Sequence, residues 1–248
     1  MKEEILLGRL IIITIAYIAM VTVNLAANIL PLNGQTTGEI SDSYTVLFTP
    51  ARYVFTIWGF IYITLAYWIY KHWFNHQIKN TISIQQTLLF TASSLLNVLW
   101  IFLWHYNYFQ LTVVVMLLLL SCLALLYFSY SNDEQTWSKR IPISIYFAWI
   151  CVATITNISF VLTSNHWNGL GLSNPLWAVI MLTLGTAIAL HIRFHHYDIY
   201  FPIVFIWAYI GIAIKNGFEE LLVTTAALFL SGVLLAGILF IKKQKPSK

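Results

Sequence analysis

Two carboxamide side chains stand in the middle of long apolar stretches. Asn97 lies in LLNVLW at residues 95–100, and Asn157 lies in ATITN at residues 153–157. A carboxamide surrounded by hydrocarbon must find a hydrogen-bond partner, so we expect both side chains to point towards another helix or towards a ligand. The residues alone leave both interpretations open.

The ten tryptophans of the sequence fall into different environments. Several lie near the ends of apolar stretches, where amphipathic indole rings are typical of the membrane interface. Four lie deeper, namely Trp58, Trp100, Trp149 and Trp207. A deep indole needs a partner for its N–H group and offers a broad flat face, so a cluster of these rings would suit a large planar apolar ligand. Ordinary helix packing is the alternative for each ring alone.

Histidine pairs are the other candidates for chemistry. His72 with His76, and His191 with His195, are each four residues apart, a spacing that can place two imidazoles on one helical face for a metal or haem iron. No cysteine or carboxylate lies at ligand spacing beside either pair, so we expect no metal site. The sequence also lacks a glycine-rich phosphate loop, a nucleophile elbow and an intramembrane carboxylate pair, which disfavours hydrolysis and proton-coupled pumping.

The elements that position these residues must lie in a membrane. Of the 248 residues, 59% are hydrophobic and only 9% are charged, and the mean hydropathy is +0.76. A soluble domain has about 25% charged residues, so an ordinary soluble protein is excluded. The 13 Lys and Arg against 9 Asp and Glu lie between and beyond the apolar stretches. We therefore interpret the basic excess as a signal of membrane topology and expect no nucleic-acid partner.

Apolar stretches of about 20 residues predict transmembrane helices. Eight such stretches lie near residues 10–30, 53–70, 85–104, 111–130, 141–162, 175–192, 200–215 and 221–241, and the seventh is the shortest. We therefore expect an all-α integral membrane protein, a polytopic bundle of about eight transmembrane helices. With eight spans, every Lys and Arg except Arg52 and Lys215 lies on the side of the two termini. The positive-inside rule then predicts that both termini are cytosolic. We also expect a multi-pass protein of the plasma membrane.

The longest predicted outer connection covers residues 31–49 and is polar. A loop of this length in a compact membrane protein is often a lid over a binding site. A tether without such a task is the alternative that the sequence leaves open.

Three stretches carry a resemblance to a known family. Residues 48–62 (FTPARYVFTIWGFIY) are similar to the opening of the second helix in the TspO/MBR family of tryptophan-rich sensory and translocator proteins. The stretch LNVLW at residues 96–100 resembles the third-helix motif of that family, and YFAWICVATITN at residues 146–157 resembles its fifth-helix motif. The three stretches occur in the family's order and cover residues 1 to about 167.

The resemblance implies a TspO-like five-helix bundle over residues 1–167, with a ligand cavity under the first long loop. Residues 168–248 would then add a three-helix membrane segment with a basic cytosolic tail. Carried over by motif position, the ligand-binding residues are Trp58, Asn97, Trp100, Trp149, Ala153 and Asn157, and the first motif adds Phe55 and Arg52. Arg52 could pair with an anionic ligand or extend to the interface.

The resemblance links the chain to porphyrins, haem, sterols and stress signalling, and it implies a homo-oligomer. We therefore expect a membrane-embedded binding or sensory protein for a planar apolar ligand such as a tetrapyrrole, with the bilayer as its other partner. Such a protein requires no cofactor, although a porphyrin or haem could be its bound ligand, and it needs no catalysis. The alternatives are a transporter of such a ligand or another amphiphile and, third, an integral-membrane enzyme.

Overall fold

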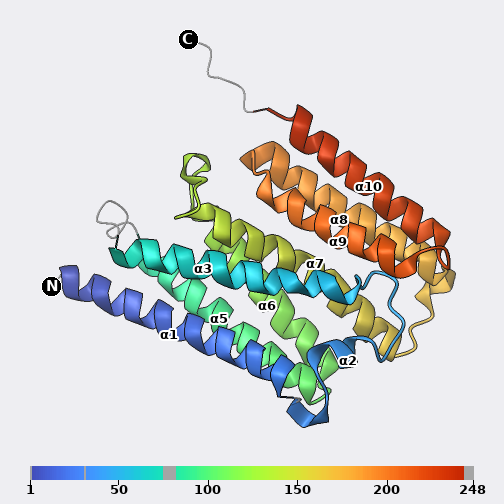
Figure 1. Cartoon of the computed structure of the whole chain (residues 1–248), viewed down its shortest axis with the longest axis horizontal. Coiled ribbons are helices and arrows are strands. Elements are labelled where there is room, and N and C mark those ends of the chain that lie inside the picture. Colours follow the sequence, from blue (N-terminus) through green and yellow to red (C-terminus); the bar gives the residue numbers. More distant parts are fainter. Residues whose placement is uncertain (1, 31, 75–81, 243–248) are drawn as a thin grey trace. The chain divides into compact units, whose positions relative to one another are not determined.

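The computed structural model describes residues 2–30, 32–74 and 82–242, and helices are the only regular elements in those ranges (Figure 1). The long helices are α1 (Lys2–Ile29), α3 (Ile57–Phe74), α5 (Ile84–His105), α6 (Phe109–Phe128), α7 (Arg140–Ser164), α8 (Asn174–His196), α9 (Tyr200–Asn216) and α10 (Leu221–Phe240). A short helix, α2 (Thr37–Ser41), lies in the first connection. Single 3-10 turns include η1 (Leu32–Gly34) and η2 (Arg52–Thr56).

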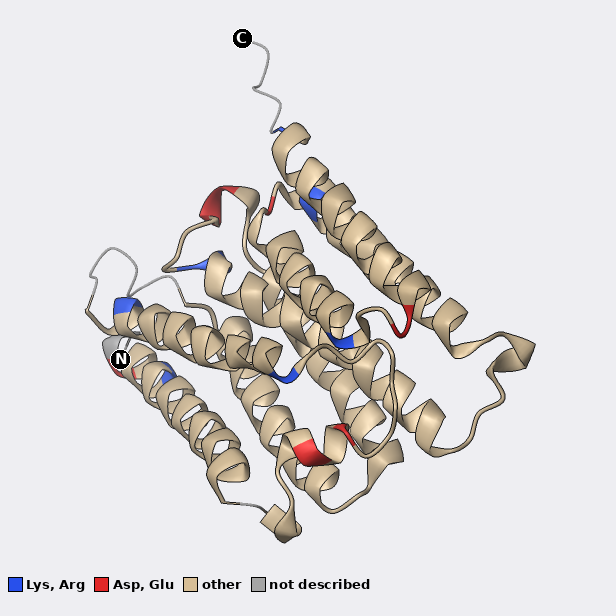
Figure 2. Cartoon of the chain, turned by 45° about the vertical axis from the view of Figure 1, so that its right-hand side comes forward, with Lys and Arg blue, Asp and Glu red and all other residues tan. Residues whose placement is uncertain are grey.

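Within the described residues, seven helical segments are long and apolar enough to cross a bilayer. The remaining long helix, α9, has 17 residues, which is about 25 Å at roughly 1.5 Å per residue, against about 30 Å of hydrocarbon. The chain is thus a polytopic helical membrane protein, as the sequence predicts, and the shortest predicted span is also the shortest long helix. Most charged residues lie near helix ends or in connections (Figure 2). The cytosolic position of the termini and the identity of the membrane stay predictions.

Local sequence signals account for several helix ends. Ser83 and Gln86 form a reciprocal capping box at the start of α5, with both hydrogen bonds at 3.0 Å. Pro175 lies in the first turn of α8, where a missing amide has no cost. Gly217 ends α9 with a φ of +51°, a backbone conformation that glycine adopts without strain.

The helices form two compact units, Met1–Thr45 with Ile57–Ile150, and Val46–Thr56 with Cys151–Lys248. In the first unit, α5 packs against α1 and α6, and α3 packs against α1. In the second unit, α8, α9 and α10 pack on one another. The predicted division at residue 167 stays a prediction.

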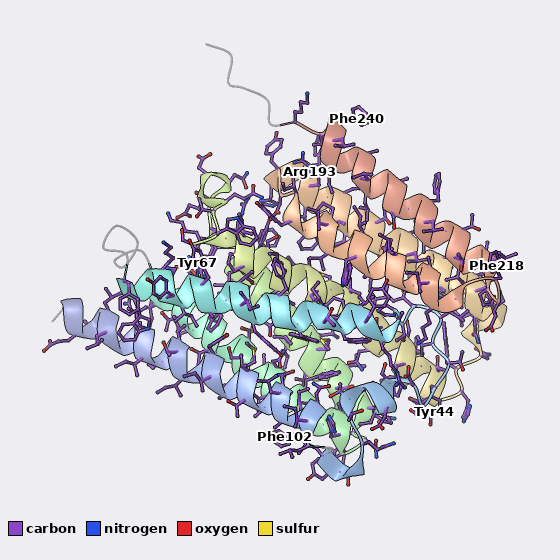
Figure 3. All side chains as sticks on the ribbon, viewed as in Figure 1. Tyr44, Tyr67, Phe102, Arg193, Phe218 and Phe240 are labelled. Carbon is purple, nitrogen blue, oxygen red and sulfur yellow. The ribbon has the colours of Figure 1, made fainter. Side chains whose placement is uncertain are left out.

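A buried arginine connects two helices of the second unit, α8 and α10. Arg193, near the end of α8 (Figure 3), donates hydrogen bonds to the carbonyls of Gly237, Ile238 and Ile241 at the end of α10. The Gly237 carbonyl also accepts the Ile241 amide at 3.2 Å, and a guanidinium with several donors can bind all three carbonyls at this helix end at once.

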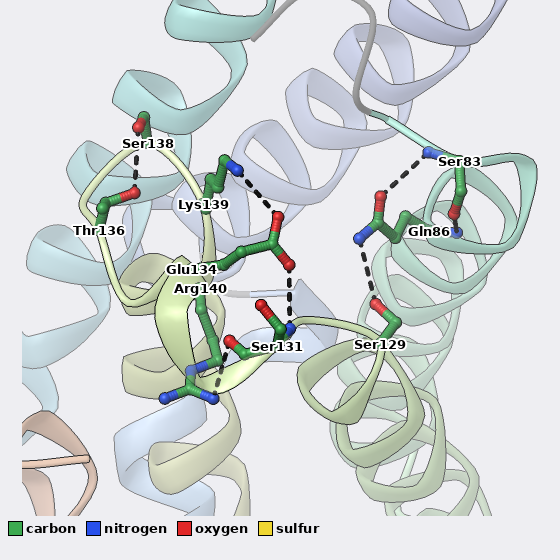
Figure 4. A network of polar contacts seen from close by, with 9 residues as sticks. All are labelled: Ser83, Gln86, Ser129, Ser131, Glu134, Thr136, Ser138, Lys139 and Arg140. Atoms are coloured by element: carbon green, nitrogen blue, oxygen red, sulfur yellow. Dashed lines mark hydrogen bonds and ion pairs between the residues drawn. The ribbon is translucent and has the colours of Figure 1, made fainter. Parts of the chain in front are cut away.

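A polar network closes the connection between α6 and α7 in the first unit (Figure 4). Glu134 accepts a hydrogen bond from the Ser131 amide at 2.9 Å and forms an ion pair with Lys139 at 2.8 Å. Arg140 is fully buried and lies over the ring of Tyr127, 5.1 Å from its centroid. Partial burial acts to raise the pKa of Glu134, but the bonds from Lys139 and Ser131 and the charge of Lys139 outweigh it and hold that pKa below its usual value.

Candidate functional site

Four aromatic rings from two helices meet in the first unit. Trp58 and Tyr62 are one turn apart on α3 and stack, with centroids 5.6 Å apart. The other two rings come from α7. The ring centroids of Tyr146 and Trp149 lie 6.0 Å and 6.2 Å from that of Trp58, both in T-shaped geometry. Such pairs are each favourable by about 0.5–1.5 kcal/mol beyond the area they bury. We call these four residues the aromatic cluster.

Trp58, which contacts the other three rings of this cluster, is only partly buried. Tyr146 and Trp149 are almost completely buried, whereas Trp58 keeps part of its surface accessible. The cluster therefore has a buried wall on α7 and a partly accessible ring on α3.

A buried chain of hydrogen bonds runs beside the aromatic cluster and joins three helices. Asn24 on α1 donates to Oδ1 of Asn97 on α5 at 2.7 Å. Asn97 in turn donates through Nδ2 to the Tyr146 hydroxyl on α7 at 3.0 Å, and that hydroxyl lies 3.6 Å from the Met20 sulfur. These hydrogen bonds give both the Oδ1 and the Nδ2 atom of Asn97 a partner on another helix, and they fix the phenol of Tyr146. A direct contact of Asn97 with a ligand stays a prediction.

The Tyr62 hydroxyl is a polar group of the cluster that takes no part in these hydrogen bonds. Its side chain is buried, and its hydroxyl has no hydrogen-bond partner among the residues that the structure describes. The neighbouring Tyr17 hydroxyl donates instead to the backbone carbonyl of Tyr62 at 2.9 Å. An unpartnered buried hydroxyl is costly, and a ligand atom could satisfy it.

The first connection is folded against the end of α5. α2 begins with a capping box between Thr36 and Glu39. Asn33 donates to the His105 carbonyl at 3.0 Å, and the Thr37 hydroxyl lies 3.0 Å from Nε2 of His105. Trp104 also donates to the Thr37 carbonyl, at 3.3 Å. Residues 32–45 are therefore anchored to α5, and whether they act as a lid stays a prediction.

The eight predicted site residues divide equally between the two units. In the first unit, Trp58 contacts Trp149 directly and is linked to Asn97 through Tyr146, while Trp100 stacks on Trp104 at 5.1 Å. The second unit holds the other four, Arg52 and Phe55 in η2 and Ala153 and Asn157 on α7. Arg52 is exposed, Phe55 and Ala153 are half-buried, and Asn157 is buried.

Three residues of this site are not among the predicted ligand residues, and each has a signal in the sequence. Tyr62 follows Trp58 by four positions and Tyr146 precedes Trp149 by three, the spacings of neighbours on one helical face. Asn24 is a polar residue within a span, where a partner on another helix is expected.

Trp207 and the histidine pairs lie elsewhere. The Trp207 ring is 36% exposed on α9, and its N–H donates to the Val54 carbonyl at 3.1 Å. The rings of His191 and His195 are 4.2 Å apart, whereas His76 lies outside the described residues. No group of three or more His, Cys, Asp or Glu residues that could hold a metal occurs in residues 2–30, 32–74 and 82–242.

Comparison with known proteins extends the resemblance over nearly the whole chain. The family model described as TSPO-like protein matches residues 10–240, a range that includes α8, α9 and α10 as well as the three motifs. No curated protein and no solved structure matches the chain. Because the match covers far more than half of the sequence, and because the membrane helices carry the motifs in order, the chain belongs to the TSPO-like family.

Proposed function

We propose that the protein binds a planar apolar ligand of the tetrapyrrole class at the aromatic cluster of the first unit. The observation that carries this proposal is the meeting of Trp58 with Tyr62, Tyr146 and Trp149 beside a buried, unpartnered Tyr62 hydroxyl. Membership of the TSPO-like family supports a binding, sensory or transport function in the membrane.

The chemistry of the cluster favours a large and largely apolar ligand. Every side chain of the cluster is neutral, and so are Asn24 and Asn97 behind it. Flat indole and phenol faces give a planar ring system extensive contact, and a single hydroxyl would fix one polar edge. The partly accessible Trp58 ring is the group that such a ligand would contact first.

Ligand binding here provides a signal without catalysis. A ligand that stacks on Trp58 must compete with its contacts to Tyr146 and Trp149, which lie on a different helix. The ligand would therefore stabilise one relative arrangement of α3 and α7 over another and shift the population towards it.

A titration of the purified protein with protoporphyrin IX, followed at the Soret band, tests this function. Trp58→Leu should weaken binding roughly 10- to 100-fold, because it removes the indole on which the ligand stacks and with it several aromatic contacts to the ligand, of about 0.5–1.5 kcal/mol each. The matched control is Trp177→Leu, which also removes one indole ring, here together with its N–H bond of 2.7 Å to the Gly169 carbonyl, in the second unit. Equal affinities of wild type, variant and control would refute the assignment of the site.

Tyr62→Phe separates the role of the hydroxyl from that of the ring. The phenyl ring can keep the stack on Trp58, so the variant changes only the hydrogen bond to the ligand. We expect roughly fivefold weaker binding, the effect of one hydrogen bond of about 1 kcal/mol. Unchanged affinity would remove Tyr62 from the set of polar contacts.

A further inference from the structure

The segment Val46–Thr56 is bound to α9 within the second unit. Three hydrogen bonds connect them: Asn216 Nδ2 to the Leu47 carbonyl at 2.9 Å, the Ala51 amide to the Gly211 carbonyl at 3.1 Å, and Trp207 Nε1 to the Val54 carbonyl at 3.1 Å. Trp207 and Gly211 are four positions apart and share one face of α9, and Asn216 is the last residue of the helix. We call Val46–Thr56 the α9-bound segment.

Apolar contacts reinforce these bonds. Phe48 meets Tyr209 edge to face at 6.4 Å, and Tyr53 meets Trp207 at 5.4 Å. Val54 is completely buried. A Cβ atom at Gly211 would overlap the Val54 side chain and would lie 3.3 Å from Cβ of Pro50. Glycine at this position therefore allows the segment to approach α9 closely.

The α9-bound segment leads directly into the helix that carries Trp58. Its last five residues form η2 (Arg52–Thr56), and η2 and α3 together make one continuous apolar helical span, Arg52–Phe74. Trp58 follows Val54 by four residues, about one helical turn. A bond that fixes the Val54 carbonyl consequently restricts the start of the helix from which the Trp58 side chain projects.

Trp207 is the residue through which this restriction acts most directly. An indole at the surface of a membrane helix would ordinarily direct its N–H to the interface. In this chain the N–H donates to a backbone carbonyl within η2, and the ring also packs on Tyr53. Both contacts are to residues within one or two turns of Trp58.

We propose that Trp207 is a positioning residue, through which α9 fixes the first turns of the Arg52–Phe74 span and thereby sets ligand affinity at Trp58. The part of this inference that concerns affinity rests on the proposed function. The part that concerns the order of the α9-bound segment does not depend on any ligand.

Trp207→Phe tests the inference, since phenylalanine keeps an aromatic ring for Tyr53 and removes the N–H donor with the five-membered ring that carries it. Trp177→Phe is the matched control, because it removes the same kind of bond, to the Gly169 carbonyl, in the same unit. Two quantities are measured in each protein: the amide hydrogen exchange of peptides that cover residues 50–62, and the protoporphyrin IX affinity. Trp207→Phe should accelerate exchange in those peptides roughly fivefold and weaken binding by a similar factor, the effect of one lost hydrogen bond. Trp177→Phe should change neither quantity.

The two measurements separate failure of this inference from failure of the proposed function. Unchanged exchange in Trp207→Phe would overturn the inference. Faster exchange with wild-type affinity would overturn the positioning role and leave the proposed function intact. If the wild-type protein binds no porphyrin, the proposed function is refuted, and faster exchange limited to Trp207→Phe still confirms that α9 fixes the segment.

Discussion

The buried chain from Asn24 through Asn97 to Tyr146 makes a quantitative prediction about stability. Asn97→Ala removes the bonds of 2.7 Å to Asn24 and 3.0 Å to Tyr146. Hydrogen bonds between membrane helices contribute about 0.6 kcal/mol on average and up to about 1.7 kcal/mol. Loss of both bonds should therefore lower the free energy of unfolding by about 1–3 kcal/mol.

A double-mutant cycle isolates the bond between α1 and α5. The variants are Asn24→Ala, Asn97→Ala and the double variant, and their unfolding in detergent is followed by tryptophan fluorescence. We expect a coupling energy of about 0.6–1.7 kcal/mol between the two positions. Asn165→Ala is the control, because this residue is exposed and its side chain donates to the carbonyl of Val161, four residues earlier, at 2.7 Å; its effect should stay within about 0.5 kcal/mol. Additive single effects would refute the inference that the two amides stabilise each other.

Three further predictions concern the glycine on α9, the end of α10 and the connection between α6 and α7. Gly211→Ala should lower the free energy of unfolding by at least about 1–3 kcal/mol, because the added Cβ overlaps Val54 of the α9-bound segment. At Gly232 on α10 an added Cβ meets no atom within 4 Å, so Gly232→Ala should raise the melting temperature slightly. Arg193→Met should accelerate hydrogen exchange near residue 237, because the last turn of α10 loses the hydrogen bonds from the Arg193 guanidinium, and unchanged exchange there would contradict a stabilising role for these bonds. Because the pKa of Glu134 is lowered in the folded state, its contribution to stability is present above its unfolded pKa and is lost as the pH falls through the folded value. The melting temperature of wild type should consequently fall more than that of Glu134→Gln on acidification, and parallel pH profiles would disprove this.

The helices could be predicted from the sequence because a bilayer imposes a minimum length on each apolar stretch. The predicted stretch at residues 141–162, for example, corresponds to α7 (Arg140–Ser164). The seventh stretch is ambiguous for the same reason, since α9 has only 17 residues and its length alone does not identify a span.

The partners of the site residues could be predicted only in part. Trp58 and Trp149 are recognisable as deep indoles, and the stack of Tyr62 on Trp58 follows from helical spacing. Periodicity does not reveal which helices face each other, so the bond between Asn24 and Asn97, 73 residues apart, has no signal beyond the polarity of each residue. The hydrogen bond from Trp207 to the Val54 carbonyl joins residues 153 positions apart. It depends on tertiary packing, so the sequence does not predict it.

Photoaffinity labelling with a diazirine-bearing porphyrin tests the location of the ligand site most directly. After illumination of the labelled protein in lipid nanodiscs, mass spectrometry identifies the modified peptides. The proposed site predicts adducts on the α3 peptide that contains Trp58 and Tyr62 and on the α7 peptide that contains Tyr146 and Trp149, and excess unlabelled porphyrin should suppress both. Adducts confined to lipid-exposed residues of other helices, or adducts that unlabelled porphyrin does not suppress, would contradict a tetrapyrrole site at the aromatic cluster.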